Sequence, residues 1–184
     1  MIQTTYNLNP SVGTEGMIAQ YMEATIIAPR LAQGLVPVGK LVTHGTDALT
    51  GPPLTTVSSN STNPGQVKAM PSGTGSDPLT RLQYLGVPIY DATRAPYDTS
   101  LGYACYEDKV TVPVMLRGPI FVSPENVSSV APGGPVYVRI SPSGGNTVIG
   151  KFSAIAGTGL VLLSAARWYS GPMQGSLAIL YLDF

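Results

Sequence analysis

Cysteine and histidine each occur once in this chain of 184 residues, as Cys105 and His44. A single cysteine cannot form a disulfide within the chain, which is typical of folding in a reducing compartment. We expect its thiol to be buried as a small apolar group. A single histidine excludes a metal centre built from several histidines. Its position before Gly45 indicates a histidine at the end of a strand.

Charge is also scarce, since only 11% of the residues are charged. Ten basic and ten acidic residues give a formal net charge of zero, and they are spread along the chain. No basic stripe for nucleic acid and no polybasic segment for an anionic membrane is present, so we expect neither as a partner. A soluble monomer commonly carries more surface charge, and the low value predicts a surface that another protein partly covers.

Long apolar runs are missing as well. The runs at residues 24–28 and 160–163 are too short to cross a bilayer. The first residues, MIQTTYNLNPS, lack the basic start and apolar core of a secretory signal. We therefore expect synthesis in the cytoplasm of a cell.

No arrangement of residues indicates catalysis. The carboxylates do not follow the spacing of a calcium loop, and the adjacent Glu107 and Asp108 would point to opposite faces of a strand. The glycines at 73 and 75 lack the lysine of a phosphate-binding loop. The sequence predicts no catalytic, cofactor-binding or metal site, and hence a protein that is not an enzyme.

The residues that are abundant favour a β protein. With 21 glycines and 17 prolines the chain is rich in turns. At residues 110–116 apolar side chains alternate with others, which is typical of a half-buried strand. We expect Gly118-Pro119 to end that strand, and further strands at 120–122 and 136–140 to complete one small antiparallel sheet. The predicted fold class is all-β, an antiparallel β-sandwich or small β-barrel with long loops and an extended N-terminal arm.

The predicted organisation is an N-terminal arm, residues 1–30, and a single β domain, residues 31–184. Two alternatives remain for the arm: it returns to its own core as a strand, or it wraps a neighbouring subunit. Residues 46–80, rich in Gly, Pro, Ser and Thr, are expected to be an exposed, loop-rich insertion with a short hairpin near residues 66–70.

The central stretch also carries a family resemblance. The charged turn Glu107-Asp108-Lys109, the alternating strand, RGPIFV at 117–122 and GPVY at 134–137 resemble the structural cement proteins of tailed bacteriophages. The likeness extends to GMIA at 16–19, Ile26-Ile27, VGKLV at 38–42, LGVPI at 85–89 with Asp91, IGKF at 149–152 and GSLAIL at 175–180. Residues 46–80 have no clear counterpart in that family.

The resemblance implies a capsid decoration protein, made in the host bacterial cytoplasm and bound to the outer surface of the virion. It implies a homotrimer at three-fold positions of the shell, with the major capsid protein as partner. Each copy would bridge several capsid subunits of the expanded, mature head. The shell would thereby resist the pressure of packaged DNA without contact to that DNA.

Candidate interface residues are apolar or aromatic side chains that could anchor a partner. They are Tyr6, Met17, Ile18, Tyr21, Ile26, Ile27, Trp168 and Tyr169. Two alternative functions stay open: another virion β module, such as a head fibre or receptor-binding module, and a carbohydrate-binding module. The second would need an exposed row among the tyrosines at 84, 90, 97, 103, 106 and 137, which core packing explains equally well.

Overall fold

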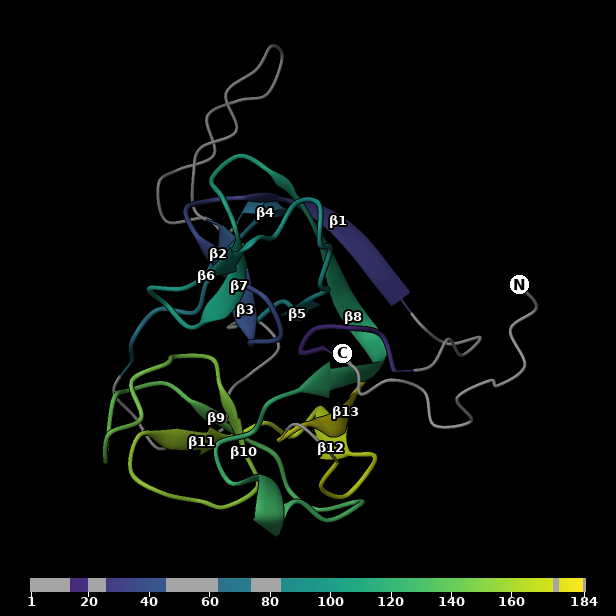
Figure 1. The fold of residues 1–184 in the computed structure, drawn as a ribbon, viewed down its shortest axis with the longest axis vertical. Coiled ribbons are helices and arrows are strands. Elements are labelled where there is room, and N and C mark those ends of the chain that lie inside the picture. Colours follow the sequence, from purple (N-terminus) through teal and green to yellow (C-terminus); the bar gives the residue numbers. More distant parts are fainter. Residues whose placement is uncertain (1–13, 20–25, 46–62, 74–83, 174–175, 184) are drawn as a thin grey trace, which may run out of the picture.

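The computed structural model describes residues 14–19, 26–45, 63–73, 84–173 and 176–183. Regular structure in these residues is β-strand, apart from one short 3-10 helix, η1 (Val127–Ser129). The all-β prediction is therefore confirmed. The strands form one large curved sheet and two small ones (Figure 1).

The large sheet has seven strands, of which β8 is the longest. Six follow the order β12 (Ala166–Trp168), β13 (Ala178–Asp183), β8 (Thr111–Val122), β1 (Ile26–Ala32), β4 (Asn63–Ala69) and β3 (Val42–Gly45), and β5 (Val87–Pro88) also pairs with β8. All these pairs are antiparallel except β1 with β4. Because β8 pairs with three other strands, it organises the fold.

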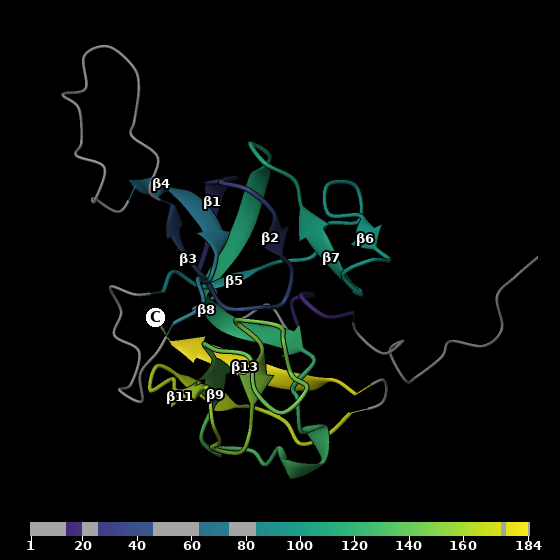
Figure 2. The same ribbon diagram turned by 90° about the vertical axis from the view of Figure 1, so that its left-hand side faces the viewer.

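The two small sheets lie toward opposite ends of β8 (Figures 1 and 2). One has the order β10 (Phe152–Ser153), β9 (Tyr137–Arg139), β11 (Leu160–Leu162), and the other β2 (Val36–Pro37), β7 (Tyr103–Tyr106), β6 (Tyr97–Asp98). The molecule thus has an upper part around β1–β7 and a lower part around β9–β13, with β8 running through both.

Two apolar cores lie along β8, which contributes to both, and the lower core also includes Val87 of β5 and Leu41 before β3. Val112 and Val114 belong to the upper core, whereas Ile120 and Val122 belong to the lower one. Side chains of one parity normally stay on one face of a strand. The even-numbered side chains of β8 nevertheless pass from the upper core to the lower one. The change occurs near a register shift between β8 and Ile26/Ile27 of β1, and near Gly118, whose φ is 123°. A glycine is suited to this bend because a side chain would be strained there.

Three predictions about strand ends and sheet membership were wrong. Gly118-Pro119 does not end a strand, because Leu182 and Tyr181 of β13 pair with these two residues and hold them in β8. Strand β9 does not share a sheet with β8 but pairs with β10 and β11. Residues 66–69 form no hairpin in an exposed loop. They belong to β4, between β1 and β3, where Val67 is fully buried.

Other expectations agree with the fold. Cys105 lies in β7 and is a buried free thiol. His44 lies near the end of β3. As a further finding, strand β13 alternates between buried residues (Ala178, Leu180, Leu182) and half-buried ones (Ile179, Tyr181). The division of the chain at residue 30 remains a prediction, although β1 begins before it and pairs with β8.

Candidate interaction surface

Two N-terminal segments lie along one edge of β8. Residues 16–19 pair with its second half: Gly16 donates its N–H to Phe121 O (2.7 Å), Phe121 to Met17 O (2.9 Å), and Ala19 to Pro119 O (3.1 Å). Strand β1 continues along the same edge, beginning where Ile26 pairs with Arg117. The described residues 14–19 and 26–30 thus lie along β8 of their own chain, and the choice between the two alternatives for the arm stays a prediction.

A buried ion pair fixes the start of this segment. Lys40 Nζ bonds Glu15 Oε1, with side chains 4% and 20% exposed, and the same oxygen accepts the N–H of Ser123 at 3.2 Å. Burial lowers the pKa of the Lys40 ammonium, while Glu15 acts in the opposite direction. Since Lys40 precedes β3 and Ser123 follows β8, Glu15 ties the N-terminal segment to both parts of the molecule.

The outward side of β12, β13 and the second half of β8 is the best candidate contact surface. Phe121 pairs with Ile179, and Arg167 pairs with Tyr181. Their neighbours along the strands fill the lower core, so these four side chains point outward. Met17, 41% exposed, extends this surface across the edge of β8 beside Phe121. We call the surface of Met17, Phe121, Arg167, Tyr169, Ile179 and Tyr181 the outer sheet face.

Aromatic and cationic groups cluster at one side of the outer sheet face. The rings of Tyr169 and Tyr181 are 6.4 Å apart between centroids, and the Arg167 guanidinium carbon lies 4.7 Å from the centre of the Tyr181 ring. Nearby, Arg117 Nε is 3.0 Å from Asp183 Oδ1. Tyrosine and arginine are the side chains enriched where proteins bind one another tightly.

A shallow hollow of about 230 Å³ lies beside this cluster. It is lined by Ser164, Ala165, Ala166, Arg167, Tyr181 and Asp183. We call it the Arg167 hollow. Its lining combines the cation of Arg167, an aromatic ring, a hydroxyl and the carboxylate of Asp183. Because Arg117 balances Asp183 at 3.0 Å, the Arg167 cation still makes the hollow suit an acidic side chain better than a purely apolar one.

A second exposed apolar area lies on β1. Ile26 is 47% exposed, Ile27 38% and Leu31 40%. We call these residues the β1 strip. Only Leu31 and Ala32 of β1 pair with β4, so the first residues of β1 have a described neighbour on the β8 side alone. Such an edge with exposed isoleucines can accept another protein segment.

The residues predicted at an interface lie in different places: four are on the two exposed surfaces, two pack in or against the lower core, and two are outside the described residues. Met17 and Tyr169 lie on the outer sheet face, and Ile26 and Ile27 on the β1 strip. Ile18 is half-buried against the lower core. Trp168 is 1% exposed and donates its Nε1–H to Pro135 O at 2.9 Å, so its side chain is a core residue of this chain. Tyr6 and Tyr21 lie outside the described residues, and the interface role of all eight stays a prediction.

Sequence reasoning missed Phe121, Arg167 and Tyr181 as surface partners of Tyr169. One signal was available, because the alternation in the last strand places Ile179 and Tyr181 on the same face. The pairing of that strand with β8 and β12 supplied the rest.

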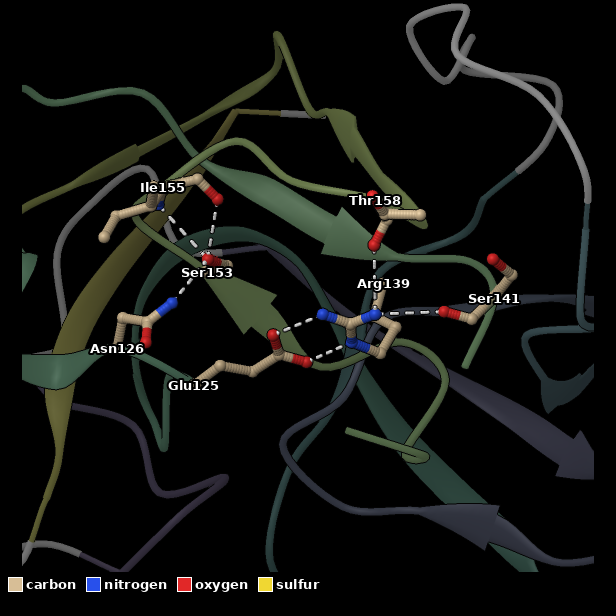
Figure 3. Close-up of polar contacts among 7 residues, drawn as sticks. All are labelled: Glu125, Asn126, Arg139, Ser141, Ser153, Ile155 and Thr158. Carbon is tan, nitrogen blue, oxygen red and sulfur yellow. Dashed lines mark hydrogen bonds and ion pairs between the residues drawn. The ribbon is translucent and has the colours of Figure 1, made fainter. Parts of the chain in front are cut away.

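A buried ion pair in the lower part holds two segments together and is not a reactive site (Figure 3). Arg139 bonds both carboxylate oxygens of Glu125, through Nε to Oε1 and through Nη2 to Oε2 at 2.7 Å. Its Nη1 donates to Ser141 O (3.0 Å) and Thr158 O (3.3 Å). The hydrogen bond from Glu125 raises the pKa of Arg139. The pair holds the loop after β8 onto the β9 sheet.

The remaining titratable side chains show no reactive arrangement. The described residues contain no group of three or more His, Cys, Asp or Glu that could hold a metal ion. Burial raises the pKa of the Cys105 thiol, which keeps it protonated and unreactive. Burial, together with Arg30, lowers the pKa of His44. Among the helices in the described part of the chain, none is long and apolar enough to cross a membrane.

The tyrosines do not form an exposed row in the described residues. Tyr84 and Tyr106 are buried, at 3% and 0% exposure, and Tyr106 donates its hydroxyl hydrogen to Ile89 O. Tyr90, Tyr103 and Tyr137 are half-buried. The side chain of Tyr97 lies outside the described set. Core packing thus explains the two tyrosines that are most enclosed.

Comparison with known proteins identifies relatives of the whole chain. The sequence model of a family described as "Structural cement protein (E217 gp24/Pam3 gp6)" matches residues 2–183. A solved structure titled "The capsid of Myoviridae Phage XM1" contains a chain with a TM-score of 0.60 and 12% sequence identity. That similarity covers 98% of each chain, and at this identity it concerns the fold. No curated protein matches the sequence.

Proposed function

Because the chain belongs to the structural cement protein family of phages, we propose that it binds the outer surface of the mature phage head and reinforces it. The observation that carries the proposal is the family match over residues 2–183, and the fold shared with a chain of a phage capsid agrees with it. A structural role in the virion capsid follows directly from membership. We propose, in addition, that the protein binds the outer surface of the shell and does so after the shell has expanded.

The proposed mechanism is mechanical and needs no catalytic group. Each copy contacts several major capsid subunits and so bridges them. A protein that binds only the expanded state stabilises that state by mass action. Assembly as a homotrimer at three-fold positions lets three modest contacts act together, which raises the overall affinity. The shell then resists the pressure of packaged DNA, while the protein contacts neither DNA nor membrane.

The contacts to the capsid and between copies involve the outer sheet face and the β1 strip. Both are supported by exposed apolar side chains, among them Met17, Ile26, Ile27 and Tyr169. Tyr6 and Tyr21 are proposed contacts from the N-terminal arm. Trp168 and Ile18 contribute by packing beneath these surfaces. The predicted insertion, residues 46–80, lies outside the described residues except for 63–73.

The test is binding of the purified chain to empty expanded shells and to unexpanded shells of its own phage, followed by sedimentation. We expect binding to expanded shells alone, and light scattering of the free chain to give about three times 19.2 kDa. Failure to bind expanded shells contradicts the proposal. Binding to host cells or glycans in place of shells would favour a receptor-binding or carbohydrate-binding module.

A further inference from the structure

Arg167 is the one cation among the six residues of the outer sheet face, and no described carboxylate forms an ion pair with it. Arg117 is balanced by Asp183 at 3.0 Å. None of the ion pairs among the described residues includes Arg167, which contacts the Tyr181 ring instead. Stacking on an aromatic ring orients a guanidinium without using its hydrogen-bond donors. Arg167 therefore presents oriented donors beside the Arg167 hollow.

We propose that the Arg167 hollow receives an acidic side chain of the major capsid protein, while the outer sheet face packs against apolar residues around it. This inference rests on the proposed function and adds the surface and the chemistry of the partner. An arginine that binds a carboxylate through two parallel N–H bonds gains both strength and orientation. The neighbouring Tyr169, Ile179 and Phe121 supply the apolar surroundings that exclude water from such a contact.

The charges of the described residues favour the capsid over a second copy of this chain. Glu15 and Glu125 are held in buried ion pairs, and Asp91 and Asp98 accept hydrogen bonds from Thr93 and Ser100 in their own turns. Asp108 accepts the N–H of Gly34, and Asp183 faces Arg117. Among the described residues, Glu107 is the one carboxylate in no such contact, so a second copy has a single described acid to offer. This favours a different protein as the source of the acid.

The experiment uses the full chain, Arg167→Glu, Arg167→Lys, and Arg94→Glu as a matched charge reversal. Arg94 is 55% exposed, lies 3.7 Å from Asp91 and belongs to the segment between β5 and β6, not to the strands of the outer sheet face. Binding to expanded shells is measured by sedimentation, with light scattering and thermal unfolding of each free variant as controls. We expect Arg167→Glu to lose at least about tenfold in affinity, Arg167→Lys to lose less, and Arg94→Glu to bind like the parent.

The outcomes separate the two proposals. If the parent binds and Arg167→Glu binds equally well, the Arg167 hollow is not the contact, although the proposed function stands. If Arg167→Glu changes the mass of the free protein, the surface joins copies and the inference is wrong. If the parent itself fails to bind expanded shells, the proposed function fails and this inference with it. A variant that unfolds is replaced by Tyr181→Ala, which removes the stacking partner and should also weaken binding.

Discussion

At the residue scale, the pair of Glu125 and Arg139 shows how charge is used inside this chain. The two side chains are only 1% and 4% exposed, and every bond of the guanidinium in Figure 3 ends on an oxygen. Burying two charges costs desolvation free energy, which a bidentate pair offsets only when its geometry is complete. The pair therefore specifies how the loop after β8 meets β9 more than it adds net stability.

Removing one partner should be more damaging than removing both. We predict that Glu125→Leu lowers the free energy of unfolding by about 3–5 kcal/mol, because it leaves the Arg139 charge buried and unpaired. The double variant Glu125→Leu with Arg139→Met should recover much of that loss, since apolar side chains of similar volume replace the pair. Urea unfolding of the three proteins measures this. Equal losses in the single and double variants would contradict it.

Tyr106 should make the fold sensitive to alkaline pH. Burial raises the pKa of its phenol above the ordinary value of 10.0. The unfolded chain therefore loses this proton first as the pH rises. Its contribution to stability is fully present below pH 10 and is lost as the pH rises through the folded-state pKa. We predict that the free energy of unfolding of the parent protein falls above pH 10. The free energy of unfolding of Tyr106→Phe should fall less steeply over the same pH range.

Tyr106→Phe also lacks the hydrogen bond to Ile89 O, and so should be about 1 kcal/mol less stable at neutral pH. Denaturant unfolding between pH 7 and pH 11 separates the two effects. Parallel pH profiles of parent and variant would show that Tyr106 does not cause the alkaline loss.

At the element scale, the segment at residues 14–19 depends on a close approach that only glycine permits. A Cβ at Gly16 would lie 2.2 Å from Val38 Cγ1 and 3.1 Å from Tyr90 N, and φ is +85°. The same segment carries Glu15 and the backbone bonds to β8. A change at Gly16 should therefore loosen the whole edge.

Gly34 offers a matched control for this prediction, because its φ of +74° is similar but a Cβ there meets nothing within 4 Å. Gly34→Ala should cost about 1–2 kcal/mol through backbone strain alone. Gly16→Ala should cost clearly more, since it adds the clash with Val38. Thermal and denaturant unfolding give both values, and equal costs would show that the close approach is easily relieved.

At the scale of the whole molecule, two cores share one strand. Met115 packs in the lower core and Val114 in the upper core, so neighbouring residues of β8 serve both. A load applied between the two parts is therefore carried along continuous backbone and sheet hydrogen bonds. This construction suits a protein proposed to bridge capsid subunits.

We predict that bound protein raises the temperature at which expanded shells rupture. A ligand present at a hundred times its dissociation constant stabilises the state it binds by about 2.7 kcal/mol per site. Calorimetry of bare shells and of shells titrated with the chain measures the shift, with unexpanded shells as the control. No shift at saturating occupancy would contradict the reinforcing role.

The sequence by itself determined the features that depend on local pattern and composition. The alternation at residues 110–116 predicted part of β8, because side chains alternate across a strand whatever that strand pairs with. Composition made an intrachain disulfide impossible, and the turn-rich, weakly charged chain indicated the all-β class. The motifs around β8 also carried the family resemblance that the comparison confirmed.

Only the tertiary structure decided which strands pair and which surfaces result. The sequence predicted that residues 63–69 belong to an exposed insertion, yet they form β4 between strands β1 and β3, and Val67 is buried there. Trp168 is of a residue type that often anchors interfaces, but in β12 its side chain packs in the lower core, while Tyr169 and Arg167 lie on the outer side. The physical reason is that sheet order and buried ion pairs depend on contacts between residues far apart in the chain. Local periodicity carries no information about those contacts.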